Sequence, residues 1–171
     1  MTRAELKNEA KEQIKGKIGI LFLIFLIIAI ISIGSSFVPI VGWFAIAIIM
    51  PAFNISLCII FLSLAKKEDI SVGDVFKGFN ITGKAVWLSI ITWFYTFLWS
   101  LLFIIPGIIK SFSYSMAPFI LADNPNLTSS EALSESIKIM NGHKFDLFVL
   151  QLSFFLWYIL GAITFGIAYI Y

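Results

Sequence analysis

Apolar residues in this chain form long uninterrupted runs that alternate with short polar segments. The runs cover residues 18–33, 39–65, 84–105, 108–122 and 145–171. An α-helix rises ~1.5 Å per residue, so about 20 apolar residues are needed to cross the hydrocarbon core of a bilayer. A helix at the surface of a soluble protein would instead alternate apolar and polar faces every ~3.6 residues. The pattern therefore predicts an all-α, multi-pass membrane protein with five transmembrane segments in this chain.

Proline and glycine mark the places where the apolar runs bend or turn. Residues 34–36 are Gly-Ser-Ser and predict a tight hairpin between the first two runs. Pro51 lies inside the second run and predicts a kink, because proline cannot donate a helical hydrogen bond. Pro106 and Gly107 separate the third and fourth runs. A single helix over residues 84–122 would be ~58 Å long, nearly twice the core, so we expect the chain to turn at this pair.

Three polar segments, residues 1–17, 70–83 and 128–142, each precede an apolar run and share one pattern. Each begins with Ser or Thr followed three residues later by an acid, which is the capping box of a helix N-terminus. Each ends in glycine followed closely by lysine. We predict three amphipathic helices on the cytoplasmic membrane surface, and a parallel repeat of a surface helix plus a hairpin. Selection of the same caps at any loop-to-membrane junction, without shared ancestry, is the alternative. The capping pairs are Thr2 and Glu5, Ser71 and Asp74, and Thr128 and Glu131.

Charge decides the predicted orientation rather than a ligand. The chain is 60% hydrophobic and 13% charged, and its net charge of +2 gives no reason to expect nucleic acid. Eleven of the twelve Lys and Arg residues lie in residues 1–17, 66–84 and 123–144, and only Lys110 falls on the other side. Short cytoplasmic loops are enriched in Lys and Arg. We therefore expect a cytoplasmic N-terminus in a plasma membrane.

The residues that usually carry catalysis or bind metal are scarce. Cys58 is the only cysteine and His143 the only histidine, so no disulfide, cysteine zinc cluster or His-rich metal site can form within the chain. Residues 78–84 approach a phosphate-binding loop, but Ala85 replaces the magnesium-binding Ser or Thr. All ten acids are expected outside the hydrocarbon core, which disfavours an intramembrane enzyme. We expect no catalytic residue, metal or other cofactor.

The fourth apolar run carries the most unusual polar residues. Lys110 is a charge within a predicted membrane segment, with Ser113 and Tyr114 about one turn further along the same face. Charges within a membrane segment are costly and mark candidate functional sites. Lys110 also lies close enough to the expected outer turn for its long side chain to reach the lipid headgroups. The face formed by these three residues is the candidate site of the sequence, and the run is expected to be tilted, broken or shielded.

The second half of the chain resembles the domain of unknown function 975 family of bacterial integral membrane proteins. The resemblance rests on Pro106-Gly107, on the Tyr-x-Met-x-Pro pattern from Tyr114 to Pro118, and on the helix end from Ser136 to Gly142. The family implies a multi-pass bacterial membrane protein, commonly with about six helices, and no assigned reaction. The apolar run that ends at Tyr171 then predicts that a sixth helix follows in a longer chain.

Two functions remain compatible with these residues. The first is a non-enzymatic role in which a single integral membrane domain, residues 1–171, organises or assists lipids or other membrane proteins. Its expected partners are the bilayer, anionic lipid headgroups and membrane proteins. The second is a small-molecule or lipid transporter or permease component, favoured by the repeat, by Pro51 and by the polar fourth run.

Overall fold

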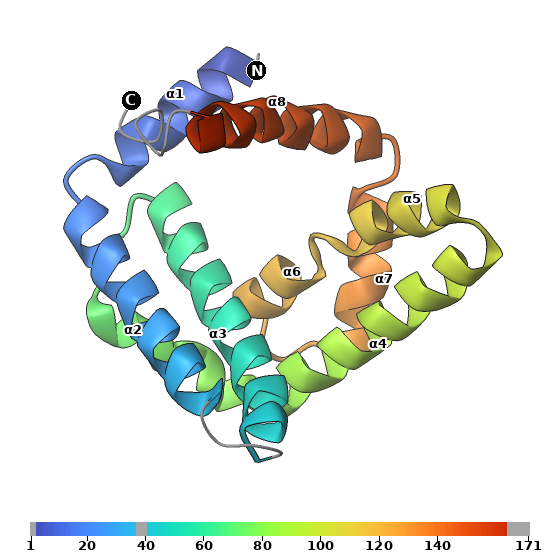
Figure 1. Ribbon diagram of the computed structural model, residues 1–171, viewed down its shortest axis with the longest axis horizontal. Helices are drawn as coiled ribbons and strands as arrows, with labels where there is room; N and C mark the ends of the chain where they lie inside the picture. Colours follow the sequence, from blue (N-terminus) through green and yellow to red (C-terminus); the bar gives the residue numbers. More distant parts are fainter. Residues whose placement is uncertain (1–2, 37–40, 164–171) are drawn as a thin grey trace.

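The computed structural model describes residues 3–36 and 41–163, and the regular structure in these ranges is helical throughout. This confirms the predicted all-α class. The elements in chain order are α1 (Arg3–Ile14), α2 (Ile18–Ser36), α3 (Val41–Ala65), the 3-10 helix η1 (Val72–Ile81), α4 (Thr82–Leu102), α5 (Ile104–Tyr114), α6 (Ala117–Asp123), α7 (Ser129–Ile139) and α8 (Lys144–Ile163). Figure 1 shows their arrangement.

Helix α3 is the centre around which the other elements pack. Its second half is covered by α2, η1, α4 and α6, and two clusters of buried apolar residues meet there (Figure 1). One cluster joins Phe53 and Ile60 of α3 to Ile24 of α2 and Val75 of η1. Ala47, Ile48 and Met50, in the first half of α3, are exposed. The second half of this helix is therefore held by protein, whereas residues 47, 48 and 50 leave apolar side chains uncovered.

Several helical stretches in the described ranges are long and apolar enough to cross a membrane. Three are straightforward: Ala47–Ala65, Val72–Leu101 and Ile104–Asp123. Glu5–Ile14 and Ile18–Gly34 make a fourth if this bent pair counts as one span. The second stretch joins η1 to α4, and the third contains the break between α5 and α6. The chain is thus a helical protein with three to four candidate membrane spans.

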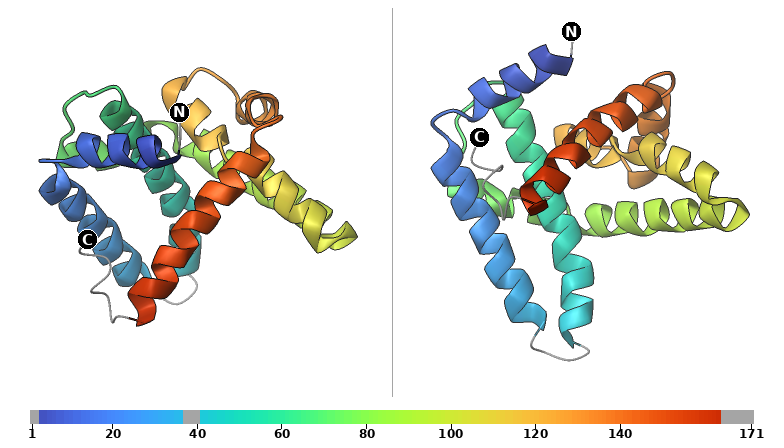
Figure 2. Two further views of the ribbon diagram at one scale, coloured as in Figure 1. Left: turned by 90° about the horizontal axis from the view of Figure 1, so that it is seen from above. Right: turned by 45° about the horizontal axis from the view of Figure 1, so that its top comes forward.

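Helices α4 and α5 form a hairpin that projects away from α3 (Figures 1 and 2). The predicted turn at Pro106-Gly107 is wrong, because α4 ends at Leu102 and Phe103 alone is extended, with φ −160° and ψ 145°. Pro106 instead lies in the first turn of α5, where a missing N–H costs no hydrogen bond. The fourth run is broken as expected, since α5 ends at Tyr114 and α6 begins at Ala117.

Residues 70–83 do not form the amphipathic α-helix that the sequence predicts. Val72–Ile81 is a 3-10 helix, which has ~3.0 residues per turn and stacks positions i and i+3 on one face. Val75 and Gly78 are fully covered on that face, and η1 packs along α3. The rings of Phe76 and Phe79 flank Phe53 at 6.4 and 5.1 Å between centroids. The apolar stripe therefore packs on α3 through Val75, while the rings of Phe76 and Phe79 touch Phe53 and remain partly exposed.

The predicted caps are present where the structure describes them. The Thr128 hydroxyl accepts a hydrogen bond from the backbone N–H of Glu131. In return, the backbone N–H of Thr128 donates to the Glu131 carboxylate at 2.8 Å, and this hydrogen bond lowers the pKa of Glu131. The N–H of Ser71 likewise donates to Asp74 at 2.8 Å. Thr2 lies outside the described residues.

Glycine closes the first and third polar segments, because Gly16 and Gly142 have φ of 85° and 87°. Gly83 does not close η1, since it belongs to the first turn of α4. The repeat is therefore matched at these helix ends in two of its three copies.

Helix α1 lies across the start of α2 and reaches α8. The axes of Glu5–Ile14 and Ile18–Gly34 differ by 84°, so α1 runs along the membrane surface if α2 crosses the bilayer. The Lys7 ammonium donates to Ser153 at 2.6 Å and stands 4.6 Å above the Phe154 ring. Both partners lie in the middle of α8, so α8 passes beside α1 (Figure 1).

One non-glycine residue among those described has a positive φ: Lys67, at 61°. It follows α3 in a Schellman motif, in which Glu68 N–H bonds Ser63 O at 2.9 Å and Lys67 N–H bonds Leu64 O at 3.0 Å. We expect Lys67→Gly to be about 1 kcal/mol more stable than Lys67→Ala, because only glycine adopts this conformation without strain.

Denaturant unfolding in detergent, followed by tryptophan fluorescence, measures this difference. Lys66 does not have a positive φ and provides the matched control, since Lys66→Gly should be less stable than Lys66→Ala. Equal stability of the two Lys67 variants would contradict the interpretation.

Candidate functional site at the helix breaks

The break between α5 and α6 is held by a serine of α7. A helix end leaves carbonyls unpaired and a helix start leaves amides unpaired. The Ser136 hydroxyl donates to Ser113 O at 2.7 Å and accepts from the N–H of Met116 at 3.2 Å. Ser136 lies on the buried face of α7, together with Ala132 and Leu133. One hydroxyl therefore satisfies both sides of the break in an apolar environment.

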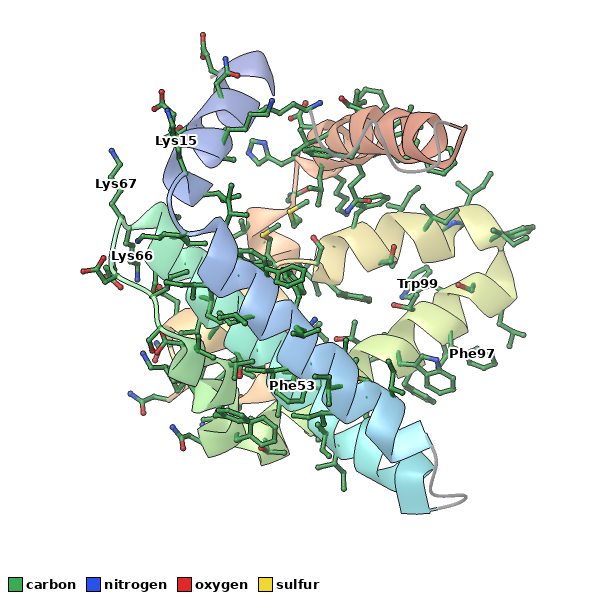
Figure 3. All side chains as sticks on the ribbon, turned by 60° about the vertical axis from the view of Figure 1, so that its left-hand side comes forward. Lys15, Phe53, Lys66, Lys67, Phe97 and Trp99 are labelled. Carbon is green, nitrogen blue, oxygen red and sulfur yellow. The ribbon has the colours of Figure 1, made fainter. Side chains whose placement is uncertain are left out.

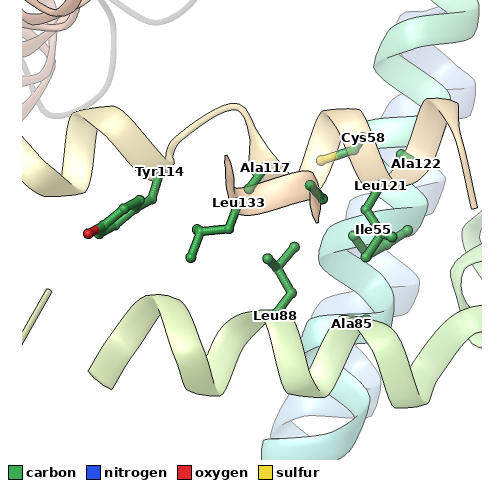
Figure 4. Packing of buried hydrophobic residues seen from close by; sticks show 10 residues of the cluster. Ile55, Cys58, Ala85, Leu88, Tyr114, Ala117, Leu121, Ala122 and Leu133 are labelled. Carbon is green, nitrogen blue, oxygen red and sulfur yellow. The ribbon is translucent and has the colours of Figure 1, made fainter. Parts of the chain in front are cut away.

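A pocket of about 360 Å³ opens between the middle of α3, α4 and this break. Prolines lie at two of its edges, Pro51 in α3 and Pro118 at the start of α6. Its apolar wall includes Ile55, Ala85 and Leu88, which pack against α6 and α7 (Figure 4). The pocket is thus built where the break between α5 and α6 faces Pro51, which lies within the continuous helix α3. Its polar lining consists of Asn54, Ser89, Thr92, Thr96 and Tyr114.

The pocket can bind by hydrogen bonding but offers no charged group. Its polar groups are alcohols, one phenol and one amide, and Ser89 already donates to Ala85 O at 3.0 Å. The Asn54 carbonyl oxygen lies 4.0 Å from the Cys58 thiol, and within the described ranges its NH₂ group donates no hydrogen bond. Among the residues that the structure describes, no three His, Cys, Asp or Glu side chains come together in a group that could hold a metal ion. The chemistry of this pocket suits a neutral polar group.

The predicted polar face of the fourth run is split by the structure. Only Tyr114 lines the pocket. Ser113 is fully buried, and its hydroxyl donates to Ile109 O at 3.1 Å. The Lys110 ammonium lies 4.6 Å from the centre of the Trp99 ring, a cation–π contact between α5 and α4. Lys110 therefore stabilises the hairpin, and its charge does not face the pocket.

Lysines join the three lysine-containing stretches, residues 1–17, 66–84 and 123–144, that the sequence assigns to one side of the membrane. Lys17 donates to Glu68 O and lies 3.9 Å from Asp69. Lys66 pairs with Asp123 at 2.7 Å, and this hydrogen bond raises the pKa of Lys66. Lys84 donates to the carbonyl oxygens of residues 125 and 126 at 2.6 and 3.4 Å. The loops that follow α1, α3 and α6 are thus bridged in pairs.

Sequence reasoning missed the residues that build this site. The candidate site predicted from the sequence contains none of Asn54, Thr92 and Thr96. A signal existed in α4, where Ser89, Thr92 and Thr96 recur at the three- and four-residue spacing of one helix face. Ser136 stood in the family pattern, but no spacing rule connects it to residues 113–116.

We expect Ser136→Ala to lower the free energy of unfolding by about 2 kcal/mol, because it leaves the Met116 N–H and the Ser113 carbonyl without this partner. Ser134→Ala, on the exposed side of the same helix, should change it by less than about 0.5 kcal/mol. Unfolding in detergent measures both. Equal effects would mean that the hydroxyl does not hold the break.

Comparison with protein-family models matches two stretches, residues 1–111 and 101–171, to the family described as "Protein of unknown function (DUF975)". Searches of curated proteins and of solved structures gave no match. The two matched stretches together cover the whole sequence, so this chain belongs to the DUF975 family.

Proposed function

We propose that this chain is a non-enzymatic membrane protein that organises lipids or partner proteins at the cytoplasmic face of a bacterial plasma membrane. In this proposal the five apolar runs cross the bilayer and the N-terminus is cytoplasmic. The bridging of residues 1–17, 66–84 and 123–144 by Lys17, Lys66 and Lys84 carries the proposal. It supports one continuous polar surface on the side where the lysines gather.

The exposed side chains support lipid as the surrounding medium. Trp87, Trp93, Phe97 and Leu101 of α4 are each more than one third exposed, although they lie in an apolar helix. Apolar surface of this extent is stable only in contact with acyl chains or with another membrane protein. Free lysines on the cytoplasmic side would attract anionic headgroups.

Photo-crosslinking in living cells tests the proposed role. A photoreactive amino acid at Glu135 or Lys138, exposed on α7, should capture lipid or a defined set of membrane proteins. The same probe at Leu101, near the α4 tip, should capture acyl chains only. A pattern that does not differ between the two sites would refute an organising role for the cytoplasmic face.

The pocket at the helix breaks favours transport of a small neutral polar solute as a second candidate. Cysteines at Thr92 and Thr96, in a Cys58→Ala background, should then react with a small impermeant thiol reagent, and a transported solute should slow the reaction. A cysteine at Ser113 is the matched control, because that side chain is buried outside the pocket. Absence of labelling at both threonine positions would exclude a water-filled path here.

A further inference from the structure

A second cavity of about 450 Å³ lies at the C-terminal end of α3, next to α1. Its floor is Leu64, which is buried, and its walls come from α1, from the turn into α2 and from the loop after α3. The remaining lining is strongly charged. It consists of Glu9, Glu12, Gln13, Lys15, Lys17, Lys67 and Asp69.

One lysine and one aspartate of this lining already pair with each other, and the remaining charged residues are two lysines and two glutamates. Lys17 and Asp69 are 3.9 Å apart. The side chains of Lys15, Lys67, Glu9 and Glu12 make no hydrogen bond or ion pair within the described ranges, although all four line one cavity. Figure 3 shows that Lys15 and Lys67 extend from the same side of the molecule. Two ammonium groups and two carboxylates are therefore available to a ligand.

Lys67 is placed at this cavity at a local energetic cost. Its φ of 61° is a conformation that glycine adopts readily and that other residues adopt under strain. Glycine does occupy the facing turn, where Gly16 has φ 85°. A lysine where glycine would be more stable indicates that its side chain is used.

The cavity lies at the level of lipid headgroups. Lys17 directly precedes α2, and Lys66 and Lys67 directly follow α3, so both apolar helices end here. Helix α1 runs at 84° to α2 and covers the cavity along the expected membrane plane. A lipid headgroup can therefore enter while its acyl chains stay beside the exposed apolar surface of α2.

We propose that this cavity binds the zwitterionic headgroup of a phosphatidylethanolamine lipid, with its phosphate between Lys15 and Lys67 and its ammonium on Glu9 and Glu12. These two acids lie three residues apart and so share a face of α1. An anionic headgroup would satisfy the lysines but would be repelled by the two carboxylates. A choline headgroup carries the same charges, but its quaternary ammonium cannot donate hydrogen bonds to a carboxylate. This inference deepens the organising function proposed above by naming the lipid.

Native mass spectrometry of the full chain, released from nanodiscs with equal amounts of phosphatidylethanolamine, phosphatidylcholine and phosphatidylglycerol, tests the headgroup selectivity. The wild type should retain the ethanolamine lipid about threefold over the choline lipid, which is the size expected for exposed charged contacts. Glu9→Gln with Glu12→Gln should bring this ratio to about one and raise retention of the glycerol lipid. Lys15→Gln with Lys67→Gly should lower retention of the ethanolamine lipid about threefold.

Lys144→Gln with Asp146→Asn is the control, because these residues at the start of α8 lie outside the cavity. The control should keep the wild-type ratio. A ratio near one in the wild type, or an equal loss in the control, would overturn the proposal.

The headgroup ratio tests the lipid site, and the crosslinks from α7 test the organising function on which this inference rests. If the headgroup ratio is near one while the crosslinks persist, the cavity assignment fails and the organising function stands. If the ratio is threefold while site-dependent crosslinks are absent, the lipid site stands and the organising function fails.

Discussion

Gly78→Val should destabilise the protein by about 3 kcal/mol, at the upper end of the usual cost of overpacking. Gly78 lies where η1 crosses α3, and its N–H donates to the buried Ser56 hydroxyl at 2.9 Å. A Cβ at this position would lie 2.6 Å from that hydroxyl oxygen and closer still to the backbone oxygen of Ala52. The backbone of a packed helix cannot move aside, so η1 would have to leave α3.

Gly83→Ala is the matched control for this prediction. Gly83 lies in the first turn of α4, and a Cβ there meets no atom within 4 Å. Alanine should therefore raise the free energy of unfolding by up to about 1 kcal/mol, through its higher helix propensity. Unfolding in detergent compares the two variants, and Gly78→Ala should fall between Gly78→Val and the wild type. A Gly78→Val protein as stable as the wild type would mean that η1 does not pack on α3 as described.

The apolar runs could be predicted because their cause is local. About 20 consecutive apolar residues have few stable arrangements other than a helix in a membrane, whatever the rest of the chain does. For the same reason the all-α class follows directly from the sequence. The capping boxes at Ser71 and Thr128 were predictable too, since the side chain and the amide that it caps lie within three residues.

The form of η1 could not be predicted with the same security. Val72, Val75 and Phe76 fit an α-helical stripe, but Val72, Val75, Gly78 and Ile81 fit a period of three equally well. The choice between them depends on α3, which offers the small side chains of Ala52 and Ser56 to Gly78. Small residues four apart on a membrane helix allow another backbone to approach closely. The contact of Gly78 with Ala52 and Ser56 is tertiary, so it cannot be predicted from the sequence of residues 70–83 alone.

The candidate site was only partly predictable, for a related reason. Pro51 and Tyr114 were singled out because each breaks a local rule, and both line the pocket. Lys110 was singled out on the same ground, but the partner of its ammonium is the Trp99 ring across the hairpin. Thr92 and Thr96 break no local rule, because hydroxyl residues are common in membrane helices. Their role depends on which face of α4 meets the break between α5 and α6.

Gly107→Val should also destabilise the protein by about 3 kcal/mol, by separating α5 from α4. Gly107 is buried, and a Cβ there would lie 2.9 Å from both the Cα and the Cβ of Ser100. Close approach of two membrane helices at a Gly–Ser contact is a common source of their association. Gly19→Val is the control, since Gly19 lies in the first turn of α2 and a Cβ there meets no atom within 4 Å.

A series of substitutions at Gly107 separates the packing role from the turn that the sequence predicts. A turn glycine with positive φ is replaced best by asparagine, because asparagine tolerates the left-handed conformation. A packing glycine is replaced best by the smallest side chain. Gly107 lies within α5 and has no positive φ, so we expect stability to fall from Gly to Ala to Asn to Val. Unfolding in detergent ranks the four proteins, and an asparagine variant more stable than the alanine variant would restore the turn at this position.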